Sequence, residues 1–196
     1  MKISFPARLV RAVVLSVIAL IVALVLPASP AAAEDGVSVG PAVVRDVQLN
    51  GEPGSTILVQ PGEAVSITAT TTDYDTGCPG CIVFVDVAYA GAPTQAGCLY
   101  GAYPAERGTQ TATVDLGPAP LEPGAYPVLA QYQQVYYCGQ YYSPDGGSAI
   151  ATVIVAPQQK ADCKKQGYQA FGGIFKNQGD CVSFVATGGR NAPAGL

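Results

Sequence analysis

Residues 123–138 read Pro-Gly-Ala-Tyr-Pro-Val-Leu-Ala-Gln-Tyr-Gln-Gln-Val-Tyr-Tyr-Cys, and the other predicted strands can be arranged around this segment. Side chains two residues apart share one face of a strand, so the stretch predicts a central strand whose core side carries Tyr126, Val128, Ala130, Tyr132, Tyr136 and Cys138. The Pro-Gly pair before this strand is a typical turn. A tyrosine at the strand start suits the corner of a two-sheet sandwich, where its hydroxyl bonds to nearby backbone.

Further strands are predicted around this one, separated by turns that contain glycine and proline. Residues 64–72 place Val65, Ile67 and Ala69 on one side and hydroxyl side chains on the other, which is typical of an antiparallel sheet with one buried face. Residues 81–89 are apolar on both faces except at Asp86, which predicts a central strand. Together with other candidate segments, the pattern predicts an all-β, immunoglobulin-like antiparallel sandwich of seven or eight strands over residues 34–156.

The first 33 residues have the pattern of a secretory signal peptide. Basic residues precede an apolar run over residues 12–26, and three alanines ending at Ala33 form a small-residue cleavage site. We expect cleavage after Ala33 and a secreted, extracellular chain that associates with the cell wall. The alternative is an uncleaved anchor, since residues 9–26 reach the lower length limit for a membrane span. Such an anchor is the only contact with a membrane that the sequence predicts.

Charge is unevenly distributed after this leader. Residues 34–157 hold two basic and twelve acidic side chains, a net charge of −10, whereas residues 158–196 hold five basic and two acidic side chains, a net charge of +3. The split predicts two modules. The acidic larger one argues against nucleic acid as a partner, because it would repel phosphates.

Composition also argues against most enzyme chemistry. The chain has no histidine, so Ser-His-Asp and Cys-His catalysis and the usual zinc sites lack a required residue. Asp73 and Asp75 with Asp86 or Asp145 offer oxygen ligands for calcium or a glycosidase pair, but solvated loop carboxylates are the favoured interpretation. We therefore expect a protein that is not an enzyme and holds no cofactor or metal.

Six cysteines, an even number in an exported chain, predict disulfides at Cys78, Cys81, Cys98, Cys138, Cys163 and Cys181. The spacing of Cys78 and Cys81 is that of a redox-active dithiol, so a thiol–disulfide oxidoreductase is an alternative function. That motif leads into a strand rather than a helix N-terminus, so a structural bridge is favoured. Cys98 and Cys138 are the next predicted pair, although pairing of either with Cys78 or Cys81 stays open.

A small C-terminal module is predicted over residues 162–190, after a linker over 157–161 and before a frayed tail over 191–196. A bridge between Cys163 and Cys181 would close a loop of about 18 residues and stabilise a piece too small to hold a core of its own. Asn177 or Asp180 is placed to cap a short helix that ends near Thr187 and Gly188.

The stretch 163–189 resembles a short C-terminal module common in secreted proteins of actinobacteria. Its Cys-Lys start and its Phe-Lys-Asn-Gln-Gly-Asp-Cys-Val-Ser-Phe end over residues 175–184 match that module, whereas Tyr168 stands where the module has tryptophan. This resemblance implies export and an actinobacterial source. The sandwich region resembles bacterial immunoglobulin-like domains through Pro61-Gly62-Glu63 and through the Pro-Gly-Ala-Tyr that begins at Pro123.

Two sets of side chains are the candidate binding surfaces. Tyrosine offers a rigid face and a polar tip for a sugar or a protein partner, and three tyrosines lie close together at Tyr137, Tyr141 and Tyr142. Lys164 and Lys165 follow Cys163 and suit anionic polymers. We expect a non-enzymatic binding or structural protein at or outside the cell surface, whose partner is a cell-envelope polymer or another surface protein. A carbohydrate-binding module is a further alternative.

Overall fold

The computed structural model describes residues 36–74, 80–90, 97–103, 108–140, 143 and 146–196, and the account below is confined to these ranges. The expected leader over residues 1–33 lies outside them. So do the sequence candidates Asp75, Cys78, Tyr141, Tyr142 and Asp145.

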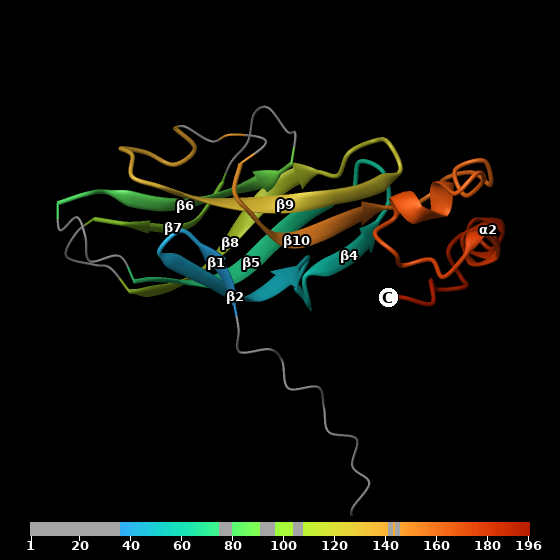
Figure 1. The fold of residues 1–196 in the computed structure, drawn as a ribbon, viewed down its shortest axis with the longest axis horizontal. Coiled ribbons are helices and arrows are strands. Elements are labelled where there is room, and N and C mark those ends of the chain that lie inside the picture. The colour runs from blue at the N-terminus through green and yellow to red at the C-terminus, as the bar shows by residue number, and fades with distance from the viewer. Residues whose placement is uncertain (1–35, 75–79, 91–96, 104–107, 141–142, 144–145) are drawn as a thin grey trace, which may run out of the picture. The chain divides into compact units, whose positions relative to one another are not determined.

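Two β-sheets form the sandwich (Figure 1). The first sheet has the strand order β1-β2-β5-β8, with β3 paired to β2, and its strands are β1 (Val37–Val39), β2 (Ala42–Leu49), β3 (Glu52–Pro53), β5 (Ala64–Asp73) and β8 (Thr109–Pro118). The second sheet has the order β4-β10-β9-β6-β7, and its strands are β4 (Thr56–Val59), β6 (Val83–Tyr89), β7 (Gly97–Ala102), β9 (Gly124–Gln133) and β10 (Ser148–Val155).

The predicted all-β, immunoglobulin-like sandwich is confirmed, with two differences in detail. The described ranges contain ten strands rather than seven or eight, because the opening segment is divided into short pieces and β7 is an additional strand. One strand pair is parallel. The chain crosses from β3 in the first sheet to β4 in the second, and β4 runs beside β10 in the same direction, with Val59 opposite Val155. All other pairs in both sheets are antiparallel.

Tyr126 forms the predicted corner. Its Oη donates a hydrogen bond of 2.8 Å to the carbonyl oxygen of Glu122, four residues upstream, and its ring packs against the core. Val128 and Ala130 follow on the core side, both fully buried, and Tyr132 is partly buried beside them.

The predicted core position of Tyr136 is wrong. The strand ends at Gln133, and Tyr136 is 81% exposed because the chain has already left the sheet. Cys138 likewise lies in the following loop rather than in β9. The alternation rule holds only while a strand continues, and here the loop folds back across the strand that precedes it.

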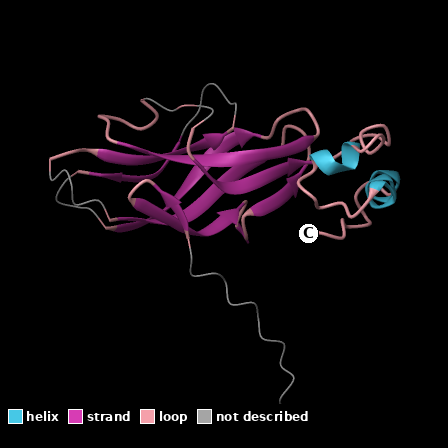
Figure 2. Cartoon of the chain, in the orientation of Figure 1, coloured by secondary structure: helices cyan, strands magenta, loops and turns pink. Residues whose placement is uncertain are grey.

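Residues after β10 form the expected disulfide-closed module. It contains the 3-10 helix η2 (Gly167–Ala170) and the helix α2 (Gln178–Ala186), both beyond the end of the sandwich at which β10 finishes (Figure 2). A Cys163–Cys181 bridge closes it. Asn177 caps α2 by accepting a 3.0 Å hydrogen bond from the backbone N–H of Asp180.

The module and the sandwich share a hydrophobic cluster. Phe171, Phe175 and Phe184 are buried in it together with Ile154 and Ala156 from the end of β10. The side chains of Leu58 and Ala125, on the two strands that flank β10, pack against the same cluster. Residues 157–161 are thus a connection between packed parts, and the described residues from 36 onward belong to one compact unit.

Candidate functional site

The candidate site lies at one end of the sandwich, where three loops meet. Antiparallel pairing brings the end of β5 beside the start of β8, and the ends of β7 and β9 beside the start of β6. The start of β10 lies at this end as well, because it pairs with the end of β9. In immunoglobulin variable domains, loops clustered at one end of the sandwich bind ligands.

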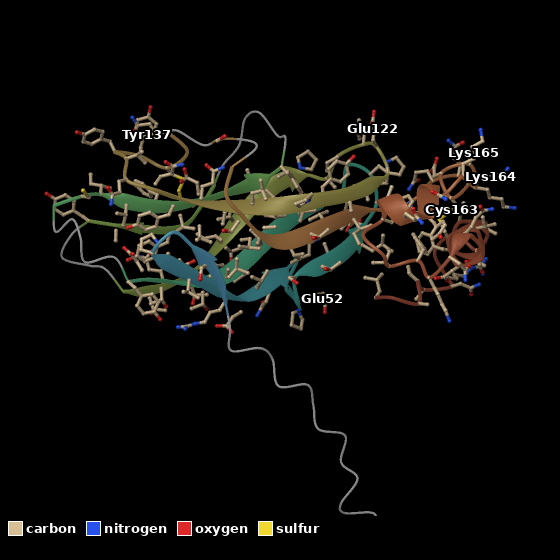
Figure 3. All side chains as sticks on the ribbon, viewed as in Figure 1. Glu52, Glu122, Tyr137, Cys163, Lys164 and Lys165 are labelled. Carbon is tan, nitrogen blue, oxygen red and sulfur yellow. A yellow bond between two sulfur atoms is a disulfide. The ribbon has the colours of Figure 1, made fainter. Side chains whose placement is uncertain are left out.

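Exposed tyrosines gather on these loops. Their exposed fractions are large: 60% for Tyr74, 66% for Tyr103, 81% for Tyr136 and 62% for Tyr137. Figure 3 shows Tyr137 beyond the end of β9 with its ring directed away from the sheet. The exposure expected for Tyr137 is therefore present, and Tyr103 and Tyr136 join it as residues that we did not expect at this surface.

A pocket of about 430 Å³ opens between these loops. Its lining combines two tyrosine rings, apolar side chains and one amide, contributed by Gly80, Cys81, Ile82, Tyr103, Gln134, Val135 and Tyr136. None of these side chains is charged. The pocket therefore offers aromatic and apolar contact with few hydrogen-bonding groups, which is the usual composition of a small-molecule or glycan subsite.

The β9–β10 loop (residues 134–147) is held across the outer face of the second sheet by Gln131. This glutamine is only 6% exposed, and its Nε2 donates to the carbonyl oxygens of Ser143 and Gly146. Its Oε1 accepts a 3.1 Å hydrogen bond from the backbone N–H of Ser143. One buried side-chain amide therefore holds the backbone of the loop against the sheet.

A disulfide holds the same loop at a second point. Cys138 in the loop is bonded to Cys98 in β7, a pair that the sequence predicted. Cys81, at the pocket, is also disulfide-bonded, and none of the described cysteines is free. Two tyrosines of the loop, Tyr136 and Tyr137, lie two and one residues before the bridged Cys138, so the bridge restrains their backbone.

Asp86 is fully buried beneath this bridge, at 0% exposure. It lies opposite Cys98 in β7 and opposite Gln131 in β9, and its Oδ1 is 3.0 Å from the Sγ of Cys98. The backbone N–H of Gly139 donates to the carboxyl group, while Oδ2 has no hydrogen-bond partner in the described part of the chain.

Burial raises the pKa of the Asp86 carboxyl, and the hydrogen bond from Gly139 opposes that rise. The folded chain therefore holds this proton more tightly than the unfolded chain does. Asp86 contributes stability that is fully present below the ordinary carboxyl pKa of about 4 and is lost as the pH rises through the raised value.

The calcium set considered from the sequence is not assembled among the described residues. Asp86 faces the disulfide in the second sheet, whereas Asp73 ends β5 in the first sheet. The single group of closely spaced potential ligand residues in the described ranges consists of Asp86 and the two bonded sulfurs of Cys98 and Cys138.

Lys164 and Lys165 lie far from the tyrosines, in the module that follows the end of β10 (Figure 3). Both are exposed, as are Lys176 and Arg190 of the module and Lys160 of the linker before it. Within the described ranges the recorded ion pair is that of Arg45 with Asp46, so no basic side chain of the module is neutralised by a described carboxylate.

No protein-family model and no curated protein matches this sequence. In the part of the chain that the structure describes, no helix is both long enough and apolar enough to cross a membrane.

Sequence reasoning found the Cys98–Cys138 pair and the exposed Tyr137, but it missed how they relate to Asp86 and Gln131. The signal for Asp86 was present, since it is the one charged residue in the otherwise apolar stretch 81–89. Its burial depends on the β9–β10 loop, which is distant in the sequence. No local pattern shows that contact.

Proposed function

We propose that this chain is an exported, non-enzymatic binding protein that recognises its partner with the tyrosine-bearing end of the sandwich. The observation that carries the proposal is the pocket between Tyr103 and Tyr136, whose described lining is uncharged and which is set among loops at one end of a rigid scaffold. Export is supported by the two described disulfides, since such bridges persist in oxidising compartments, and by the leader pattern over residues 1–33.

The chemistry of the pocket favours a neutral glycan as ligand. A tyrosine ring gives an apolar face that covers the C–H face of a sugar, while its hydroxyl and the amide of Gln134 serve sugar hydroxyls. Among the described residues no charged side chain lines the pocket, and residues 34–157 carry a net charge of −10, which disfavours an anionic ligand.

Serine at both Tyr103 and Tyr136 is expected to abolish most binding to neutral oligosaccharides. Loss of one well-packed aromatic anchor costs about 2 kcal/mol, roughly 30-fold in Kd, and loss of both costs more. A glycan array identifies the oligosaccharide that the native chain binds, and calorimetric titration with it measures the change. Because both side chains are exposed in the free protein, the fold should be unaffected.

Tyr74→Ser is the matched control, since Tyr74 is 60% exposed at the same end but does not line the pocket. Its affinity should equal that of the native chain. A double variant that binds as tightly as the native chain, or a native chain that retains no neutral oligosaccharide, would contradict this assignment.

A second proposal concerns the module: its basic side chains hold the chain on anionic polymers of the cell envelope. The supporting observation is that Lys164 and Lys165 are exposed, adjacent and held by the buried Cys163. The two lysines lie at the opposite end of the sandwich from Tyr137 (Figure 3), so the tyrosine end stays accessible while the module is bound.

Replacing Lys164 and Lys165 by glutamine is expected to weaken retention on anionic wall polymer several-fold at 0.05 M salt, a condition under which charges act over more than about 10 Å. Retention of the native chain should itself fall as salt is raised. The measurement is elution from immobilised polymer in a salt gradient. Arg45→Gln, which removes a basic charge from the sandwich, should elute as the native chain does; equal elution of the lysine variant would place the contact elsewhere.

A further inference from the structure

We propose that the Cys98–Cys138 bridge is a site of thiol–disulfide exchange with an external protein dithiol, and that Asp86 donates the proton to the departing sulfur of Cys98. This exchange goes beyond the binding function, and it does not depend on the identity of any ligand. The chain is the substrate of the exchange, and no catalytic turnover by the chain is implied.

The proposal rests on the contact between a buried carboxyl and a disulfide sulfur. Asp86 Oδ1 lies 3.0 Å from Cys98 Sγ, and a sulfur within a closed bridge carries no hydrogen. The hydrogen available to this contact is therefore that of a protonated Asp86, whose O–H donates to sulfur as a weak acceptor. Asp86 is 0% exposed, so bulk water does not compete for the position.

The surroundings keep this carboxyl protonated over a wider pH range than usual. Cys98 faces Asp86 from β7, Gln131 faces it from β9, and Cys138 and Gly139 cover it from the β9–β10 loop. None of these described groups titrates while the bridge is closed, and none is charged. Burial raises the pKa of Asp86, and the N–H of Gly139 is placed to stabilise the carboxylate that remains after proton transfer.

The geometry also selects which sulfur is attacked. A thiolate approaches a disulfide in line with the S–S bond, and the far sulfur leaves. Cys138 lies in the loop next to the exposed Tyr137, and neither Cys138 nor Cys98 is buried. Since the proton donor is beside Cys98, Cys98 is the leaving sulfur and Cys138 is the point of attack.

The exchange proceeds in two balanced steps. A thiolate of the dithiol bonds to Cys138 Sγ, the Cys98–Cys138 bond breaks, and its electron pair goes to Cys98 Sγ, which takes the proton of Asp86. The second thiol of the dithiol, after losing its proton to solvent, then attacks the mixed disulfide and releases Cys138 as a thiolate. Two electrons thus pass to the chain, and the dithiol leaves as a disulfide.

Opening the bridge detaches the β9–β10 loop from β7. The described residues of the loop then keep their hydrogen bonds to Gln131 and that from Gly139 to Asp86, but the covalent link at Cys138, two residues after Tyr136 and one after Tyr137, is lost. Reduction is therefore expected to alter the tyrosine end. This consequence, unlike the exchange itself, rests on the proposed binding function.

The test reduces the oxidised mature chain with dithiothreitol between pH 5 and 8, quenches by alkylation, and follows each cysteine pair by peptide mass spectrometry. Each reduction rate is divided by the concentration of dithiothreitol thiolate, so that the titration of the reagent does not contribute to the pH profile. We expect the resulting rate constant for reduction of Cys98–Cys138 to fall as the pH rises through the pKa of Asp86. The Cys163–Cys181 bridge, with both cysteines 0% exposed and no such carboxyl contact among the described residues, is the internal control without this inflection.

Asp86→Asn is expected to lower the rate constant for Cys98–Cys138, on the acidic side of the inflection, by about a hundredfold or more, the lower end of the range for loss of a general acid, and to remove the inflection. Protection of Cys163–Cys181 in the same sample reports that the variant is folded. Because the native pH profile needs no variant, the proposal stays testable if the variant does not fold. Identical profiles for both bridges, or an unchanged rate in a folded variant, would overturn it.

Glutathione, a monothiol, provides a separate test of direction. It forms a mixed disulfide at the attacked cysteine and has no second thiol to resolve that disulfide intramolecularly, so the adduct can be trapped by a rapid acid quench. We expect the adduct on Cys138, and an adduct on Cys98 would overturn the assignment of Cys98 as leaving sulfur. Loss of oligosaccharide binding with normal exchange would contradict only the proposed function, so the two proposals fail separately.

Discussion

Replacing Phe171 by alanine is expected to lower the free energy of unfolding by about 3–5 kcal/mol, the cost of removing a fully buried phenylalanine. Phe171 is 1% exposed, and its ring meets that of Phe175 edge to face with centroids 5.5 Å apart. The same cluster contains Ile154 at the end of β10. The loss therefore falls on both the module and the second sheet, and we expect one unfolding transition at a lower denaturant concentration.

Urea unfolding followed by far-ultraviolet circular dichroism and by tyrosine fluorescence measures this effect, because most tyrosines lie in the sandwich and α2 lies in the module. Both probes should shift together. Leu121→Ala is the control: Leu121 is 77% exposed, so its truncation should change stability by no more than about 0.5 kcal/mol. A variant in which only the helical signal moves would show that the module unfolds independently.

The shared cluster also decides how the basic module is to be studied. Deleting residues 158–196 would uncover Ile154 and the side chains of Leu58 and Ala125 that pack against the module. A truncated chain would then expose an apolar patch, and altered retention on a polymer would have two causes. Charge substitutions at Lys164 and Lys165 leave the cluster intact and separate these causes.

The alternation of apolar and polar residues predicted the strands well wherever one face of a strand is buried and the other is exposed to solvent. In β5, Val65, Ile67 and Ala69 are at most 1% exposed, as their spacing indicated. The intervening threonines pair with threonines of β8, for example Thr68 with Thr113 at 2.8 Å between hydroxyl oxygens. Here sequence, local geometry and packing agree, so the strand could be recognised from the sequence alone.

The strand β7 escaped prediction because adjacent side chains in it are both buried. Leu99 and Tyr100 are 0% and 1% exposed, and two glycines, Gly97 and Gly101, interrupt any pattern. Tyr100 is accommodated because its Oη accepts a 3.0 Å hydrogen bond from the backbone N–H of Gly108. That contact joins β7 to the start of β8 and has no counterpart in the periodicity of the sequence.

The candidate site shows the same division. The even number of cysteines predicted the Cys98–Cys138 bridge, and the clustering of tyrosines in the sequence predicted that Tyr137 is exposed. The exposure of Tyr136 and the burial of Asp86 both follow from the fold-back of the β9–β10 loop, which Gln131 and the bridge hold in place. These are consequences of tertiary contacts, and they are the ones that give the site its chemistry.

Tyr126→Ala is expected to lower the free energy of unfolding by roughly 3 kcal/mol, from the loss of a partly buried ring and its hydroxyl bond. The Oη of Tyr126 donates 2.8 Å to the carbonyl oxygen of Glu122 and fixes the turn before β9, the strand that pairs with both β10 and β6. The matched variant Tyr126→Phe keeps the ring and should lower the free energy of unfolding by only about 1 kcal/mol. Urea unfolding of the two variants and of the native chain measures these changes.

The pH dependence of the Tyr126→Phe difference distinguishes the hydrogen bond from packing. Burial, with a smaller effect of the Glu122 carboxylate, raises the pKa of Tyr126, so the folded chain holds the phenolic proton more tightly than the unfolded chain. The stability this supplies is fully present below the ordinary tyrosine pKa of about 10 and is lost as the pH rises through the raised value. The native chain should therefore lose its advantage over Tyr126→Phe in that range. An unchanged denaturant midpoint in Tyr126→Ala would show that the corner does not stabilise the strand, because ring and hydroxyl bond would then both be dispensable.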